Sequence, residues 1–279
     1  MYNFYLIFEG IRILIFYILN ISKELKVALI QADLVWENPH ENRTRFEHTI
    51  NSISDTVDVI VLPEMFTTGF TMNAVKLAET MEGTTVLWMQ KIAKEKNATI
   101  LGSIIIKENN AFYNRLLFVF PEGKIETYDK RHTFTLAGED KMFSAGKSKA
   151  IISYKGWKIC PLICYDLRFP IWVRNTNNYD VLIYVANWPT PRITAWNALL
   201  KARAIENMSY TIGVNRVGED ANEHLYSGHS AGYDCLGNEL CKSELKEEIL
   251  IITLDKESQQ KTRKKFGFLD DMDSFIIQY

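Results

Sequence analysis

Short segments made almost entirely of aliphatic residues recur along the chain, and segments with apolar residues at helical spacing separate them. The apolar segments include VDVIVLPE (57–64) and DVLIYVANWP (180–189), and the helical ones include TTVLWMQKIAKEKN (84–97) and ITAWNALLKARAIENM (193–208). Strands without polar positions are typical of sheets that are covered on both faces. The alternation therefore predicts an α/β domain of three or four layers, in which helices cover at least one face of each sheet.

The remaining elements follow from shorter signals. The segment NAFYNRLLFVFPEGKIETYDK (110–130) predicts two antiparallel strands around Gly123, because PEG between alternating stretches is a hairpin signal. The charge-rich segment 256–275 predicts a solvated stretch that two phenylalanines anchor to the domain. A helix is expected over 38–54, and further strands are expected over 26–34, 98–108, 159–166, 210–218 and 226–240.

Composition narrows the classes of function. A chain of 279 residues with 47% hydrophobic and 24% charged residues fits a single folded domain better than a disordered chain. The formal net charge of −2, without a block of Lys and Arg, argues against a nucleic-acid partner and favours a small molecule. Because GxGxxG, GxxxxGK[ST] and HExxH are all missing from the sequence, neither a nucleotide cofactor nor a metal is expected.

The four cysteines, Cys160, Cys164, Cys235 and Cys241, show no CxxC spacing. A chain of this length has no need of a disulfide framework. We therefore expect reduced thiols and a cytoplasmic protein.

Residues 1–22 differ in character from the rest of the chain. The stretch 5–22 is strongly apolar, but Glu9 and Arg12 interrupt it, and each costs about 2.5–3.5 kcal/mol at a bilayer centre. A membrane span is therefore not favoured. A marginal anchor, a helix packed on the domain or a partner, and an extension from an upstream start assignment all remain open, and we favour the last. The domain itself is expected over 23–279.

Three chemically active residues follow predicted strands. Glu64 ends the segment 57–64, Lys130 follows the second strand of the hairpin, and Cys164 directly follows ICPLI (159–163). Taken alone, each has an ordinary explanation: a strand that reaches the surface at Glu64, a solvated charge cluster around Lys130, and a cysteine that serves as a small apolar residue. Cys160, upstream on the same strand, is expected to be such a buried residue.

Cys164 carries the strongest local signal because YDLRF follows it at once. The abrupt change from apolar to polar residues predicts a turn from strand to helix that exposes the sulfur. A thiol at a helix N-terminus is favoured as a thiolate, and the free backbone N–H groups there can stabilise an oxyanion. Cys164 is therefore the candidate nucleophile.

Six segments in a fixed order add a resemblance to these local signals. Together they closely resemble the nitrilase superfamily of carbon–nitrogen hydrolases, and within it the bacterial omega-amidases. The segments are LPEMFTTGF (62–70), YDKRHTF (128–134), AGEDKMFSAG (137–146), CYDLRFP (164–170), YVANWPTPR (184–192) and ARAIENMSY (202–210). The resemblance implies a single-domain, four-layer αββα sandwich, a catalytic triad of Glu64, Lys130 and Cys164, a second glutamate at Glu139, and a homodimer or higher homo-oligomer.

Amide hydrolysis assigns a role to each of these residues. Without a partnering histidine, Glu64 is expected to take the proton of Cys164, which then attacks the amide carbonyl. Lys130 and the backbone N–H of Tyr165 are expected to stabilise the oxyanion. Ammonia leaves a thioester, and water activated by Glu64, with Glu139 orienting substrate or water, releases the acid. No cofactor is required.

The substrate follows less directly. The resemblance implies small 2-oxo dicarboxylate monoamides such as 2-oxoglutaramate and 2-oxosuccinamate, whose carboxylate suits an arginine. Arg168 and Arg192 are the candidates, although an ion pair between Arg168 and Asp166 is an equally good explanation of the former. Three aromatic residues are candidates for the walls of a small pocket, although Trp196 is better placed in the core. They are Phe66, Trp188 and Trp196.

Three alternatives remain open. The first keeps the fold but changes the substrate to deaminated glutathione, a nitrile or an N-carbamoyl compound. A Cys–His mechanism would use His132 or His229. A non-catalytic scaffold tethered through residues 1–22 would have no chemical need for the three triad residues.

Overall fold

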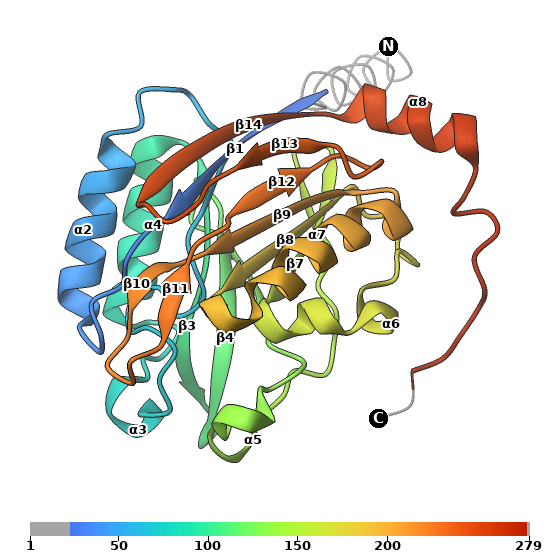
Figure 1. Ribbon diagram of the computed structural model, residues 1–279. Coiled ribbons are helices and arrows are strands. Elements are labelled where there is room, and N and C mark those ends of the chain that lie inside the picture. The colour runs from blue at the N-terminus through green and yellow to red at the C-terminus, as the bar shows by residue number, and fades with distance from the viewer. Residues whose placement is uncertain (1–22, 278–279) are drawn as a thin grey trace, which may run out of the picture.

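Two six-stranded sheets face each other in the computed structural model, which describes residues 23–277 (Figure 1). The first sheet has the order β14-β1-β2-β3-β4-β5, with β1, β2 and β3 parallel and the outer pairs antiparallel. Its strands are β1 (Glu24–Gln31), β2 (Val59–Val61), β3 (Thr99–Glu108), β4 (Ala111–Val119), β5 (Ile125–Asp129) and β14 (Glu248–Asp255). The predicted hairpin is thus β4 and β5.

The second sheet has the order β13-β12-β9-β8-β7-β6, with β7, β8 and β9 parallel at its centre. Its strands are β6 (Ile152–Tyr154), β7 (Trp157–Ile163), β8 (Val181–Ala186), β9 (Tyr210–Asn215), β12 (Ala231–Tyr233) and β13 (Glu239–Lys242). A separate two-stranded ribbon joins β10 (Val217–Glu219) to β11 (Leu225–Ser227).

Helices cover the outer face of each sheet (Figure 1). On the first sheet lie α2 (Pro39–Asn51), capped by Asn38, and α4 (Thr84–Lys96). On the second lie α6 (Pro170–Val173) and α7 (Ile193–Asn207). The close approach of α7 requires glycine at position 213 of β9, because a Cβ there would lie 2.5 Å from Leu200 Cδ1. The order helix, sheet, sheet, helix confirms the four-layer αββα sandwich.

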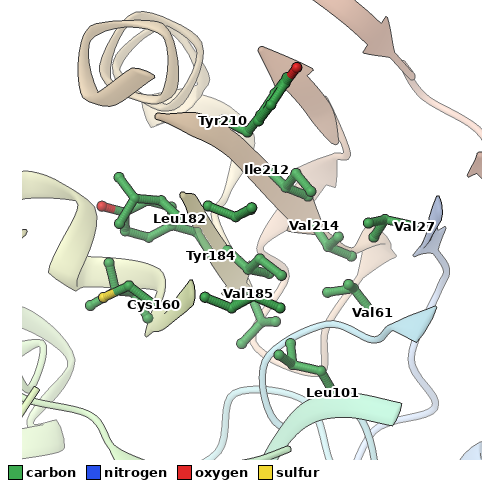
Figure 2. Close-up of a cluster of buried hydrophobic side chains, with 14 of the residues drawn as sticks. Val27, Val61, Leu101, Cys160, Leu182, Tyr184, Val185, Tyr210, Ile212 and Val214 are labelled. Atoms are coloured by element: carbon green, nitrogen blue, oxygen red, sulfur yellow. The ribbon is translucent and has the colours of Figure 1, made fainter. Parts of the chain in front are cut away.

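Side-chain alternation explains why the sheets carry so few polar residues. In β1, Leu25, Val27 and Leu29 face the second sheet, whereas Ala28 and Ile30 face α2 and α4. Figure 2 shows part of the core between the sheets, with Val27 and Val61 beside Val214 of the second sheet. Both faces of the first sheet are therefore buried, as its apolar sequence requires.

Short elements connect the layers. They are α3 (Ala74–Leu77), α5 (Glu139–Met142) and the 3₁₀ helices η1 (Thr135–Ala137), η2 (Cys164–Arg168) and η3 (Thr190–Arg192). Several of them surround the end of the sandwich where β2, β7 and β8 terminate. In residues 23–277, no helix is both long enough and apolar enough to cross a bilayer. The expected extension over 1–22 lies outside the described residues.

The C-terminal segment corrects one prediction. It forms a helix, α8 (Lys256–Phe266), capped by Asp255. Its phenylalanines do not anchor it, since Phe266 and Phe268 stack on each other and remain exposed. Arg263 instead holds the helix by donating to the carbonyl of Met208 at 2.7 Å. Arg263 also donates from Nη2 to the Tyr179 carbonyl at 2.7 Å, so the anchor is polar.

Candidate active site

A cavity of about 680 Å³ opens at the end of the sandwich where the parallel strands of both sheets terminate. Glu64 follows β2, Cys164 follows β7 and Asn187 follows β8. Carboxyl ends of parallel strands are where α/β sheets place their ligands. The polar residues that end these strands therefore converge, although they lie up to 123 positions apart in the sequence.

Three ionisable residues form the buried charge cluster at the cavity floor: Glu64, Lys130 and Glu139. The Lys130 Nζ atom lies 2.8 Å from Glu64 Oε1 and 2.9 Å from Glu139 Oε2. Side-chain exposure is 1% for the lysine and 0% for both glutamates. Only Lys130 reaches the cavity wall. The two acids stand behind it, and each charge has a partner that offsets the cost of burial.

Burial sets the protonation behaviour of this cluster. It raises the pKa of Glu139 above its ordinary value, even though the Lys130 ammonium lowers it. Burial alone would lower the pKa of Lys130, but the carboxylates of Glu139 and Glu64 reverse this and raise it. Lys130 is therefore a fixed positive charge that points into a site of low dielectric constant.

Cys164 begins the cysteine turn, the 3₁₀ helix Cys164–Arg168 that follows β7 directly. The predicted turn is present, but it is a 3₁₀ helix of five residues rather than the start of an α-helix. Cys164 has φ +43°, a left-handed conformation, and it lines the cavity. Burial, reinforced by the Glu64 carboxylate, raises the pKa of the thiol well above its ordinary value. The resting thiol is therefore protonated and needs a base.

Two asparagines complete the site, and sequence reasoning missed both. Asn114 of β4 donates from Nδ2 to Glu64 at 2.8 Å and to Glu139 at 3.3 Å. The backbone N–H of Asn187 donates to Glu64 Oε2 at 2.8 Å, and its carbonyl oxygen lies 4.0 Å from the Cys164 sulfur. A signal for both was present in the sequence: Asn114 is a polar residue within an apolar strand, and Asn187 directly follows one.

Two arginines line the cavity above this floor. The Arg168 guanidinium lies 4.9 Å from the Trp188 ring centroid, and that of Arg192 lies 5.0 Å from the Phe134 ring. The alternative of an Arg168–Asp166 ion pair is wrong, because Asp166 instead accepts hydrogen bonds from other residues.

Aromatic residues predicted near the site divide between wall and core. Trp188 and Tyr165 line the cavity. Phe66 does not, so its prediction as a wall residue is wrong: it is fully buried in the core, 5.5 Å from Phe46 between ring centroids. The left-handed turn at Met65 (φ +42°) directs the Phe66 ring back under the first sheet. Trp196 lies in the core, as expected.

Both histidines proposed for a Cys–His mechanism direct their rings elsewhere. His132 Nδ1 lies 2.7 Å from Asp166, and its ring stacks on Phe169 at 3.7 Å between centroids. His229 Nδ1 contacts Asn197. Neither ring pairs with the Cys164 sulfur, so the geometry favours a carboxylate as the base. Within residues 23–277, no group of three or more His, Cys, Asp and Glu residues is arranged to hold a metal ion.

Known proteins are similar to this chain over most of its length. The family model described as carbon-nitrogen hydrolase matches residues 26–264. The chain is 43% identical to the omega-amidase YafV of Yersinia enterocolitica over 254 residues, which cover 91% of this chain and 98% of that protein. It is 34% identical to the 2-oxoglutaramate amidase of Bacillus subtilis, with 88% and 96% covered.

A solved structure gives the same result for the fold. XC1258 from Xanthomonas campestris, described as a CN-hydrolase superfamily protein with an arsenic adduct in the active site, superimposes with a TM-score of 0.90. The two sequences are 36% identical, and the match covers 91% of this chain and 99% of the other. Sequence and fold therefore agree over the same part of the chain.

Proposed function

Because the chain belongs to the carbon–nitrogen hydrolase family, we propose that it is an omega-amidase that converts a 2-oxo dicarboxylate monoamide and water into the 2-oxo acid and ammonia. One observation carries the proposal: a cysteine and a fixed ammonium share the floor of a cavity whose wall holds two arginines. The names of the relatives, omega-amidase and 2-oxoglutaramate amidase, support the same substrate class.

The first half-reaction begins with a proton transfer. Glu64 takes the thiol proton of Cys164, and the sulfur attacks the amide carbon. The raised pKa of the thiol makes this transfer necessary at neutral pH. Asn114 and the Asn187 N–H hold the Glu64 carboxylate by hydrogen bonds of 2.8 Å each, so that the base keeps its orientation.

Negative charge then develops on the carbonyl oxygen. Lys130, which lines the cavity beside Cys164, supplies a positive charge there, and the backbone N–H of Tyr165 is the second donor that we propose. Glu139 holds the lysine from behind at 2.9 Å. Its role is therefore to orient Lys130 rather than to touch the substrate.

Collapse of the tetrahedral intermediate breaks the C–N bond. Glu64 returns its proton to the nitrogen, ammonia leaves, and the acyl group remains on Cys164 as a thioester. A water molecule that gives its proton to Glu64 attacks the thioester, which releases the acid and restores the thiol. The same carboxylate thus acts as base and acid in both halves.

Recognition of the 2-oxo acid is assigned to the arginines. Among residues 23–277, neither Arg168 nor Arg192 has a carboxylate partner, and each guanidinium lies over an aromatic ring instead. A cation that is held by a ring and has no ion pair is ready to bind a carboxylate. We assign Trp188 to the support of Arg168.

Assembly and location are part of the same proposal. Ile171 of α6 and Ile205 of α7 are exposed on the outer helical layer of the second sheet, which supports a homodimer or higher homo-oligomer. All four cysteines are free thiols, which supports a cytoplasmic location. Light scattering tests the oligomeric state, and cell fractionation tests the location.

Ammonia release from 2-oxoglutaramate by the purified protein tests the activity. Wild type should release ammonia, and Cys164→Ala should release none, because the nucleophile is missing. Parallel assays with deaminated glutathione, a nitrile and an N-carbamoyl amino acid separate the alternatives. Release from one of these substrates but not from 2-oxoglutaramate would refute the omega-amidase, and release by Cys164→Ala would refute the nucleophile.

A further inference from the structure

Asp166 lies two residues after Cys164, and its side chain is fully buried. One carboxylate oxygen accepts the Ile163 N–H at 3.1 Å and the Tyr128 hydroxyl at 2.8 Å. The other accepts the His132 N–H at 3.0 Å and lies 2.7 Å from His132 Nδ1. Both oxygens are used inside the protein, which separates Asp166 from the groups that touch a substrate.

The partners of Asp166 belong to different sheets. Ile163 is the last residue of β7 in the second sheet, whereas Tyr128 lies in β5 of the first sheet and His132 follows that strand. Lys130 stands between these two partners. The Asp166 carboxylate therefore ties the segment that carries the lysine to the turn that carries the cysteine.

The conformation of Cys164 explains why such a tie is needed. Its φ of +43° is unfavourable for a residue with a Cβ, and a strained residue persists only where its surroundings hold it. Asp166 holds the Ile163 N–H on one side of the cysteine. On the other side, Arg203 of α7 donates to the Leu167 carbonyl from Nε at 3.1 Å and from Nη2 at 2.6 Å.

We propose that Asp166 is a positioning residue, whose carboxylate holds Cys164 in front of Lys130 by tying the cysteine turn to the opposite sheet. The inference rests on the proposed role of Cys164 as nucleophile. Without the tie, the turn relaxes toward ordinary backbone angles, and the sulfur moves away from the buried charge cluster toward solvent. Asp166 acts on the reaction only through this geometry.

The test compares Asp166→Asn with a matched control, Asp180→Asn. Both aspartates are buried beside strands of the second sheet, and Asp180 accepts the Lys158 N–H at 2.8 Å and pairs with Lys256 at 2.7 Å. Asp180 precedes β8, whereas Asp166 follows the parallel strand β7, so the two stand at opposite ends of the sheet. Each variant replaces a buried carboxylate oxygen by an amide group, but only one of them adjoins Cys164.

The first readout is alkylation of Cys164 by iodoacetamide as a function of pH, measured by mass spectrometry of the Cys164 peptide. It needs no substrate, so it remains informative if 2-oxoglutaramate is not hydrolysed. In Asp166→Asn the pH at which the alkylation rate is half-maximal should fall toward the pKa of a free cysteine. At neutral pH, alkylation should then accelerate about threefold for each pKa unit, because the gain in thiolate exceeds the loss in nucleophilicity. Asp180→Asn should keep the wild-type profile.

The second readout is the kinetics of 2-oxoglutaramate hydrolysis per folded molecule. A displaced nucleophile should lower kcat about 100-fold in Asp166→Asn with little change in KM. The control should retain the wild-type kcat. A wild-type alkylation profile in Asp166→Asn, or equal losses of kcat in the two variants, would overturn the proposal.

A second pair of variants covers the case in which Asp166→Asn does not fold. His132→Ala removes one donor to Asp166, whereas His132→Asn places an amide nitrogen where Nδ1 lies. The alanine variant should shift the alkylation midpoint in the same direction, and the asparagine variant should restore it. Identical profiles for these two variants would also count against the tie.

Discussion

Two clusters in this molecule place one cation between two carboxylates. They differ in how deeply the carboxylates are buried, and the cation is an arginine in one and a lysine in the other. In the surface charge cluster, Arg115 lies between Asp129 and Glu108. Its Nε donates to Asp129 at 2.6 Å, and its Nη1 and Nη2 donate to Glu108 at 3.2 and 3.1 Å. The side chain of Glu108 is 44% exposed. The planar guanidinium matches both carboxylates. The Arg115 side chain is only 7% exposed, and solvent reaches the cluster through the two carboxylates.

The buried charge cluster has the same charges in a different setting. Lys130 is a point charge between Glu64 and Glu139, with no exposure of either acid. The alternation of β4 separates the two clusters, since Asn114 faces the space between the sheets and contacts the buried cluster, whereas its neighbour Arg115 faces the other way.

Burial changes the direction of the pKa shift. In the surface cluster, the hydrogen bond from Arg115 lowers the pKa of Glu108. In the buried cluster, burial raises the pKa of Glu139 despite the adjacent ammonium. One cation between two acids is therefore a structural clamp at the surface, and a cluster with increased proton affinity at the cavity floor.

The largest difference should appear in activity when one carboxylate of each cluster is neutralised. Glu64→Gln keeps the shape of the side chain but removes the base, so kcat for 2-oxoglutaramate should fall about 1,000-fold. Glu108→Gln, the matched control, should keep kcat within about twofold, since surface substitutions rarely disturb the rest of a fold. Steady-state ammonia release measures both. Comparable losses would show that Glu64 acts only through the stability of its surroundings.

Stability should separate the clusters next, when each loses its cation. Lys130→Met leaves two buried carboxylates without a partner and should lower the free energy of unfolding by about 3–5 kcal/mol. Arg115→Met leaves carboxylates that water can solvate and should cost about 1 kcal/mol. Urea unfolding followed by circular dichroism measures the difference. Equal losses would contradict the argument that burial, rather than charge arrangement, decides the energetics.

Sequence signals were strongest for the residues that end strands. Glu64, Lys130 and Cys164 each follow an apolar or alternating segment, but the abrupt change of polarity favoured only Cys164. Glu64 and Lys130 have ordinary explanations when taken alone, and the resemblance joined them to the cysteine. The four-layer fold followed from the resemblance, and the sheets themselves followed from the apolar segments. These signals are local, because they depend on one strand at a time.

The residues that sequence reasoning missed act between strands. Asn114, Asn187 and Asp166 have partners in another part of the chain, and in the last two cases in the opposite sheet. No spacing within one segment encodes such a contact. The same reason explains the error at Phe66, where the turn at Met65 returns the ring to the core.

The smallest effect, and the one most specific to the comparison, is the dependence of stability on pH. Glu139 has a raised pKa in the folded state, so its contribution to stability is full below the pKa of an unfolded glutamate and is lost as pH rises through the folded value. Glu108 has a lowered pKa, so its contribution is present above the unfolded value and is lost as pH falls.

Wild type should therefore gain stability relative to Glu139→Gln between pH 7.5 and pH 4.5, by on the order of 1 kcal/mol. As pH falls below about 4.3, the ordinary pKa of a glutamate, it should lose stability relative to Glu108→Gln, by a smaller amount because Glu108 is exposed to solvent. Urea unfolding of the three proteins at several pH values gives both differences. If both stability differences changed with pH in the same direction, the Lys130 ammonium would outweigh burial and lower the pKa of Glu139. The two clusters would then differ in location but not in the direction of their pKa shifts.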